Sequence, residues 1–299
     1  MAMGQADAAS RGPCVDLSEG PVETHRAMFE GQFHAGSHML SFGDVTYVMG
    51  VINVSPESKN PHTIATTPAE ALDLARRYRQ WGADLIDVGG QSSHIDNPTI
   101  AVEEEVARLV PVVEALVGDG LLVSVDTWKA GVAAAAVAAG AAIVNDTGGF
   151  RRPDMRRVAA DSDAGVVAVH VDGDHPHAVD EVVLGDDKAE VTAAGFRRLL
   201  DDVGAEMASR VILDPGIAIN YRGDYDAYTR LQLEVIRRSP ALAELGRPLL
   251  IPIPRKRDIH WVAAYITMAL EYGADMIRVH DVALAAELTR LWDRTVGHG

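Results

Sequence analysis

The sequence predicts a (β/α)₈ barrel, a closed parallel sheet of eight strands surrounded by helices. From Val45 onward, an apolar run, a polar or glycine-rich break and a helical pattern follow one another eight times along the 299-residue chain. The apolar runs are typical of strands buried on both faces, and the alternation implies right-handed crossovers. Eight repeats favour closure over an open doubly wound sheet, and no G-x-G-x-x-G follows the first strand. We therefore expect the TIM barrel fold.

The individual elements follow from runs of four to ten apolar residues and from helical spacing of apolar positions. The expected strands are residues 45–54, 84–88, 121–125, 142–145, 165–169, 210–213, 248–253 and 275–279. The expected helices are residues 69–81, 101–117, 130–139, 154–161, 188–209, 226–238, 260–272 and 282–296.

The first forty residues lack a sustained period. We expect residues 1–40 to be a partly irregular N-terminal extension with a short helix near residues 23–30, and residues 41–299 to be the barrel. A single large domain agrees with the usual length of such barrels, which is about 250 residues.

Composition excludes several classes of protein. The net charge of −16 argues against binding of nucleic acid, which requires a basic surface. The single cysteine, Cys14, excludes an internal disulfide framework and a cysteine-ligated metal site, so a reducing cytoplasm is the expected location. No apolar run is long enough to span a membrane, so we expect no membrane partner.

A polar residue ends every expected strand. In a barrel these ends converge on one mouth, where such enzymes keep their active sites. Asp and Asn often cap a following helix, but Lys and Arg do not cap helix N-termini. The combined set suits a heteroaromatic ligand with a hydrogen-bonding edge and an anionic arm. The set comprises Asn53, Asp87, Asp126, Asn145, His170, Asp214, Arg255 with Lys256, and Arg278 with His280.

Seven motifs in order resemble the dihydropteroate synthase family. They run from the Met-Gly-Val-Ile-Asn-Val-Ser-Pro-Glu-Ser stretch at residues 49–58 to Arg-Val-His-Asp-Val at residues 278–282 and cover nearly the whole barrel. The others are residues 82–92, 124–129, 145–146, 213–216 and 254–256.

The resemblance implies a transferase that joins a pterin diphosphate to an amine. It assigns the pterin to Asp126, Asn145, Asp214 and Lys256, and the catalytic roles to Lys256, Asp214 and Asp126. It assigns Mg²⁺ to Asn53 and the diphosphate to Asn53, His94, Arg278 and His280. It also implies a homodimer formed through the late helices.

The two loops expected to close over the second substrate depart from the family pattern. After Ser58 an aromatic residue is replaced by Lys59, and Ser93-His94 replaces a threonine-arginine pair. Arg257 stands where a serine usually contacts the carboxylate of p-aminobenzoate. We therefore expect a paralogue with an altered second substrate. An ordinary folate-pathway synthase, a methyltetrahydrofolate-type methyltransferase and a non-catalytic pterin-binding protein are the alternatives.

Two further patterns have competing interpretations. The stretch of imidazoles and carboxylates from His170 to His177 suits a metal site, but a solvated loop is the favoured interpretation. Lys129 is either a partner of Asp126 or the first turn of a helix, and we favour the latter.

Overall fold

The computed structural model describes residues 29–179, 188–219, 224–256 and 258–295, and its main feature is an eight-stranded parallel sheet. The strands are β3 (Tyr47–Asn53), β4 (Leu85–Gly89), β5 (Val123–Asp126), β6 (Ile143–Asp146), β7 (Gly165–Val169), β8 (Val211–Asp214), β9 (Leu250–Pro252) and β10 (Met276–Val279). Their order is β8-β7-β6-β5-β4-β3-β10-β9, and a parallel bridge between Leu213 and Leu249 joins the two ends. The predicted closed barrel is confirmed.

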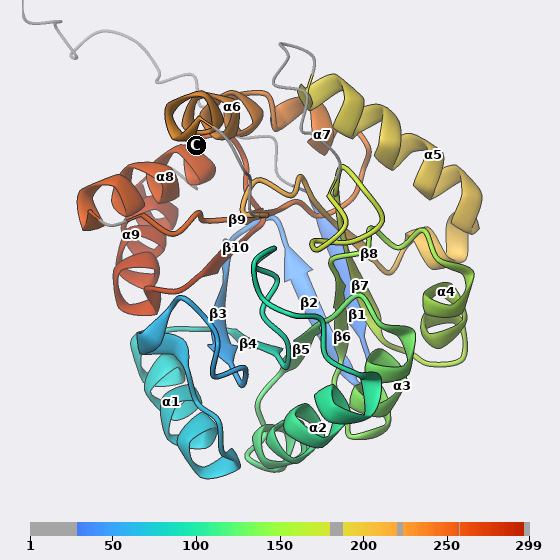
Figure 1. Ribbon diagram of the computed structural model, residues 1–299. Helices are drawn as coiled ribbons and strands as arrows, with labels where there is room; N and C mark the ends of the chain where they lie inside the picture. The colour runs from blue at the N-terminus through green and yellow to red at the C-terminus, as the bar shows by residue number, and fades with distance from the viewer. Residues whose placement is uncertain (1–28, 180–187, 220–223, 257, 296–299) are drawn as a thin grey trace, which may run out of the picture.

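The helices form a ring around the sheet (Figure 1). They are α1 (Pro68–Trp81), α2 (Val102–Gly118), α3 (Ala130–Ala138), α4 (Pro153–Ala160), α5 (Lys188–Ala208), α6 (Tyr225–Arg237), α7 (Pro240–Ala243), α8 (Ile259–Glu271) and α9 (Val282–Thr295). A 3-10 turn, η1 (Pro61–Thr63), follows β3. Across the described ranges, no helix combines the length and apolarity needed to cross a membrane. The predicted strands and long helices are all present, with boundaries within two residues.

An antiparallel hairpin precedes the barrel. It consists of β1 (Gly31–Ala35) and β2 (His38–Phe42). The expectation of irregular chain is therefore wrong for residues 31–40. The expected helix near residues 23–30 lies outside the described residues as far as Met28, and Phe29 and Glu30 are not helical.

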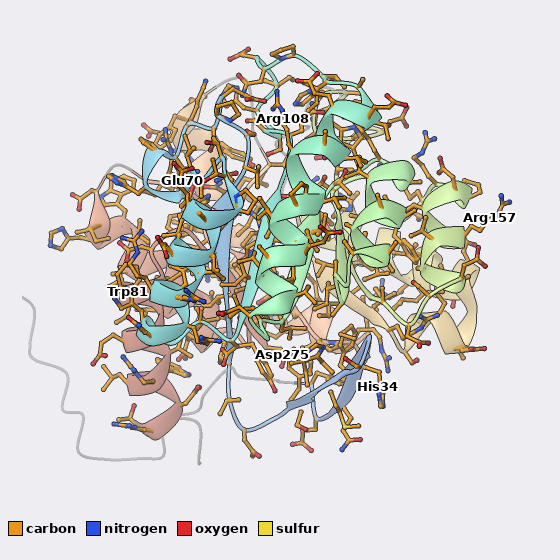
Figure 2. All side chains as sticks on the ribbon, turned by 90° about the horizontal axis from the view of Figure 1, so that it is seen from below. His34, Glu70, Trp81, Arg108, Arg157 and Asp275 are labelled. Carbon is orange, nitrogen blue, oxygen red and sulfur yellow. The ribbon has the colours of Figure 1, made fainter. Side chains whose placement is uncertain are left out.

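The hairpin closes the end of the barrel where the strands begin. Its inward side chains belong to the same buried cluster as the residues at the starts of β4, β9 and β10. Figure 2 places His34 of β1 and Asp275 at the same end of the barrel, opposite Glu70 and Arg108. The carboxylate of Asp275 accepts the backbone N–H groups of Phe29 at 2.9 Å and Leu249 at 2.8 Å. The open mouth is therefore at the other end.

The packing of Phe33 fixes the hairpin against β7. Its side chain is 1% exposed, and a Cβ added to Gly165 would come within 2.7 Å of its ring. Only glycine leaves space for that ring at this point of the strand.

We predict that Phe33→Ala lowers the free energy of unfolding by about 3–5 kcal/mol, because it leaves a cavity in a packed core. Chemical denaturation of both proteins measures this difference. The control is Met39→Ala in the same hairpin, since Met39 is 51% exposed and its loss should cost less than about 0.5 kcal/mol. Equal effects of the two substitutions would show that the hairpin is not part of the core.

Candidate active site

Asp87 organises the polar residues at the centre of the mouth. It is the middle residue of β4 and has no exposed surface. Its Oδ1 accepts a hydrogen bond from Ser124 Oγ at 2.6 Å. Its Oδ2 accepts bonds from Asn145 Nδ2 at 3.1 Å and Arg278 Nε at 2.6 Å. These three donors come from β5, β6 and β10, so one carboxylate positions side chains from three other strands.

Arg278 joins Asp87 to Asp126. A second guanidinium nitrogen donates to Asp126 Oδ2 at 2.7 Å, and the arginine side chain is only 16% exposed. Burial opposes its charge, but Asp87 and Asp126 together raise the pKa of Arg278 above its ordinary value. The guanidinium is therefore a permanent charge held between two carboxylates.

A hollow opens beside this ion pair. Its polar lining includes Asp126, Asn145, Asp214 and Arg278, and its apolar lining includes Val169, Ile219 and Pro252. Asn145 Oδ1 is buried and has no hydrogen-bond partner among the described residues. An unpartnered buried acceptor is costly unless a ligand supplies a donor. The lining therefore suits a flat ring with N–H groups along one edge.

The orientation of Asp214 depends on Gly216. Gly216 adopts φ +72°, and a Cβ at this position would lie 1.8 Å from the carbonyl oxygen of His170. No other residue fits this turn. The turn lets the N–H of Gly216 donate to Asp214 Oδ1 at 2.7 Å, which fixes the carboxylate at the edge of the hollow.

Burial also shifts the protonation of the carboxyl groups. It raises the pKa of Asp214 to about 7, against the opposing hydrogen bond from Gly216. It raises the pKa of Asp126 to about 7 as well, although Arg278 opposes the shift. Burial therefore opposes the ionisation of both carboxyl groups, and carboxyl groups perturbed in this way are common in functional sites.

A second cavity of about 290 Å³, which we call the mouth cavity, adjoins the hollow and shares Ser93, Asp126, Ala218, Ile219 and Arg278 with it. Its lining contains many of the residues that the sequence pointed to. These are Asn53, Ser58, Lys59, Ser93, His94, Lys256 and His280. Arg257 lies outside the described residues.

Two tyrosines of the mouth cavity were not predicted. Tyr225 and Tyr228, on α6, line it, and Tyr225 is 56% exposed. The hydroxyl of Tyr228 donates to the carbonyl oxygens of Ile217 and Ile219 at 3.1 and 2.5 Å. The chain lacks the aromatic residue that the family pattern has after Ser58, but Tyr225 and Tyr228 of α6 place aromatic rings in the mouth cavity.

Lys256 lies in the mouth cavity and does not line the hollow. Its Nζ donates to Gln232 Oε1 at 3.0 Å and Thr229 Oγ1 at 3.2 Å. It also lies 4.7 Å from the ring centre of Tyr225. The structure thus brings Asp126, Asn145 and Asp214 together as expected, and places Lys256 in the adjoining space.

Asn53 ends β3 and His280 directly follows β10, and both line the mouth cavity. Asn53 Nδ2 donates to Thr63 Oγ1 at 2.6 Å, which orients the amide. Burial, with a smaller effect of Arg278, lowers the pKa of His280 to about 3, so its ring is neutral. The amide oxygen of Asn53 is a hard donor of the kind that Mg²⁺ prefers.

The histidines after β7 make packing and hydrogen-bond contacts. The ring of His175 stacks on Trp128 with centroids 5.3 Å apart, and His177 contacts Ser92 and Thr99. In the part of the chain that the structure describes, no group of three or more His, Cys, Asp or Glu side chains could hold a metal ion.

Lys129 is more than the start of a helix. Its Nζ donates to Glu105 Oε2 at 2.7 Å and to the carbonyl oxygen of Ile100 at 2.7 Å, and the two charged side chains are 11% and 1% exposed. Lys129 also donates to Gln91, so it holds both ends of the loop between β4 and α2. Its partner is Glu105, and neither sequence interpretation anticipated this.

The comparison with known proteins agrees with this geometry. The family model described as pterin binding enzyme matches residues 49–280. Dihydropteroate synthase of Bacillus subtilis is 30% identical over 282 residues, which cover 89% of this chain and 94% of that protein. A probable bifunctional folylpolyglutamate synthase/dihydropteroate synthase of Haloferax volcanii is 33% identical over 83% of this chain, which spans only 30% of that longer protein.

Among solved structures, Burkholderia cenocepacia dihydropteroate synthase complexed with 7,8-dihydropteroate superposes with a TM-score of 0.74. It is 30% identical, and the match covers 90% of this chain and 97% of that one. The family model, the full-length relatives and the fold therefore agree that this chain belongs to the dihydropteroate synthase family of pterin binding enzymes.

Proposed function

We propose that this protein joins a 6-hydroxymethyl-dihydropterin diphosphate to an aromatic amine. The amine nitrogen forms a bond to the exocyclic methylene carbon as the carbon–oxygen bond to diphosphate breaks. The electron pair leaves with the diphosphate, and the amine nitrogen loses a proton. The observation that carries the proposal is the hollow lined by Asp126, Asn145, Asp214 and Arg278.

The hollow offers a complementary edge for the pterin. The carboxylate of Asp214 would accept hydrogen bonds from the ring amino group and the adjacent ring N–H. Asn145 Oδ1, which is buried without a partner in the described chain, would accept another. The mouth cavity shares Asp126 and Arg278 with the hollow, so a ligand that spans both would reach Lys256.

The diphosphate would occupy the mouth cavity. Mg²⁺, with Asn53 and diphosphate oxygens as ligands, would neutralise part of the leaving group's charge. Arg278 contributes positive charge at the boundary of the two cavities. Because His280 is neutral, it would contribute a hydrogen bond rather than a charge.

For the second substrate we propose p-aminobenzoate. The altered loops suggested a different amine, but relatives that match over their full length are dihydropteroate synthases. The aromatic surface of Tyr225 and Tyr228 also supports an amine with a flat ring. An altered amine remains the second candidate because the loop residues differ from the family pattern.

We expect the purified protein, given the pterin diphosphate, magnesium and p-aminobenzoate, to form dihydropteroate and diphosphate in equal amounts. Tyr225→Ala should raise the KM for the amine several-fold and leave pterin affinity unchanged, whereas Tyr225→Phe should behave as wild type. Chromatographic product analysis measures both. Activity only with other amines would favour the altered substrate, methyl transfer would favour the methyltransferase, and pterin binding with no turnover would favour a binding protein.

Pterin affinity should depend on pH through Asp214. The ring needs the carboxylate as acceptor, and the pKa of Asp214 is about 7, so the dissociation constant should rise about tenfold per pH unit below that value. Asp214→Asn should bind weakly at every pH. Calorimetric titration between pH 5.5 and 8.5, roughly one and a half units each side of that pKa, measures both effects. Wild-type affinity in Asp214→Asn would refute the assigned role.

The same shift should make Asp214 destabilising at neutral pH. In the unfolded chain this carboxyl ionises near 3.8, whereas the folded value is raised to about 7. Its contribution to stability is thus present below about pH 4 and is lost as pH rises to about 7. We expect Asp214→Asn to raise the free energy of unfolding at pH 8 by ~1 kcal/mol or more. A less stable variant in urea denaturation would contradict this sign.

A further inference from the structure

Lys59 and His94 contact each other in the lining of the mouth cavity. Lys59 lies on the loop after β3 and His94 on the loop after β4, and Lys59 Nζ is 2.8 Å from His94 Nε2. Burial, and then the charge of Lys59, lower the pKa of His94 below its ordinary value. A neutral His94 accepts from the ammonium group, so the positive charge at this point belongs to Lys59.

Two other cations of the mouth cavity, Arg278 and Lys256, are held by protein partners. Arg278 is paired with Asp87 and Asp126, and Lys256 donates to Gln232 and Thr229. Lys59 lies 4.0 Å from Asp96, and both side chains are at least half exposed, so this ion pair is weak. The charge of Lys59 is therefore available to a ligand.

Arg255 adds a second charge beside Lys59. Its guanidinium donates to the backbone carbonyl oxygen of Lys59, and within the described ranges it has no carboxylate contact. The charge of Arg255 also contributes to lowering the pKa of His94 and of His280, so it lies near both rings. Lys59 and Arg255, together with the neutral His94, thus form a cluster that carries two positive charges on the wall of the mouth cavity.

The two loops that carry this cluster are joined. Arg108 of α2 pairs with Glu57 at 3.1 Å, and Asn97 Nδ2 donates to the carbonyl oxygen of Glu57 at 3.3 Å. On the far side, His177 contacts the carbonyl oxygen of Ser92 and the hydroxyl of Thr99, each at 2.9 Å. These contacts, together with those of Lys129, hold the loop of His94 against the loop after β3 on one side and against His177 on the other.

Resting on the function proposed above, we propose that Lys59 and Arg255, oriented by His94, form the subsite for the leaving diphosphate in place of the arginine that His94 replaces. Charge-assisted bonds from an ammonium and a guanidinium to phosphate oxygens are stronger than neutral ones. The departing diphosphate would thus gain two cations from residues outside the Arg278 ion pair.

Calorimetric titration with inorganic pyrophosphate and magnesium tests this subsite without an amine or turnover. Lys59→Ala should weaken pyrophosphate binding about tenfold, the effect of one charged hydrogen bond, and Lys59→Arg should bind nearly as wild type. His94→Arg in the Lys59→Ala background should recover affinity. The control for charge loss is Arg157→Ala, an exposed residue of α4 on the flank of the barrel (Figure 2), which should have no effect.

A kinetic comparison separates anion binding from a general loss of structure. Lys59→Ala should raise the KM for the pterin diphosphate and leave the dissociation constant of 6-hydroxymethyl-dihydropterin, which has no phosphate, unchanged.

Equal pyrophosphate binding in Lys59→Ala and Arg157→Ala, or no binding by the wild-type protein, would overturn the subsite. Failure of turnover with every amine, combined with Lys59-dependent pyrophosphate binding, would instead refute the proposed function and leave the subsite standing.

Discussion

The ion pair of Arg278 with Asp87 and Asp126 is the interaction on which the mouth of this barrel depends. It joins β10 to β4 and β5 with contacts of 2.6 and 2.7 Å, and Asp87 also orients Asn145 and Ser124. Removing one member of such a buried pair leaves the others without compensation for their lost hydration. The positions of Asp126, Asn145 and Ser124 therefore depend on this buried cluster.

Burying these carboxyl groups at the mouth costs folding stability. Buried carboxylates such as Asp214 and Asp126 are held where they resist ionisation, which destabilises the folded state near neutral pH. At the opposite end of the barrel the buried carboxylate of Asp275 accepts two backbone N–H groups, and the core around it is filled by the aromatic and aliphatic side chains of the hairpin. One end of the barrel thus contributes stability, and the other end holds buried carboxyl groups whose ionisation is opposed. The fold generally allows this division.

Charge at the mouth is also distributed between strands and loops. Arg278 is fixed by the barrel, whereas Lys59 and His94 depend on two loops that hold one another. A residue on a strand end is positioned by the sheet itself. A loop residue needs supports such as Lys129 and His177, and these can change within a family without altering the fold.

The sequence by itself determined the barrel and the residues at its strand ends, because apolar periodicity is a local pattern and eight alternating repeats favour a closed sheet. The hairpin was missed although Phe33, Ala35, Leu40 and Phe42 alternate, since two short strands are stable only on a surface that another part of the chain supplies. Only the tertiary structure placed Tyr225 at the mouth, turned Lys256 towards α6 and paired Lys129 with Glu105. Those contacts join residues far apart in the chain, and the direction of a long side chain depends on partners that no local pattern reveals.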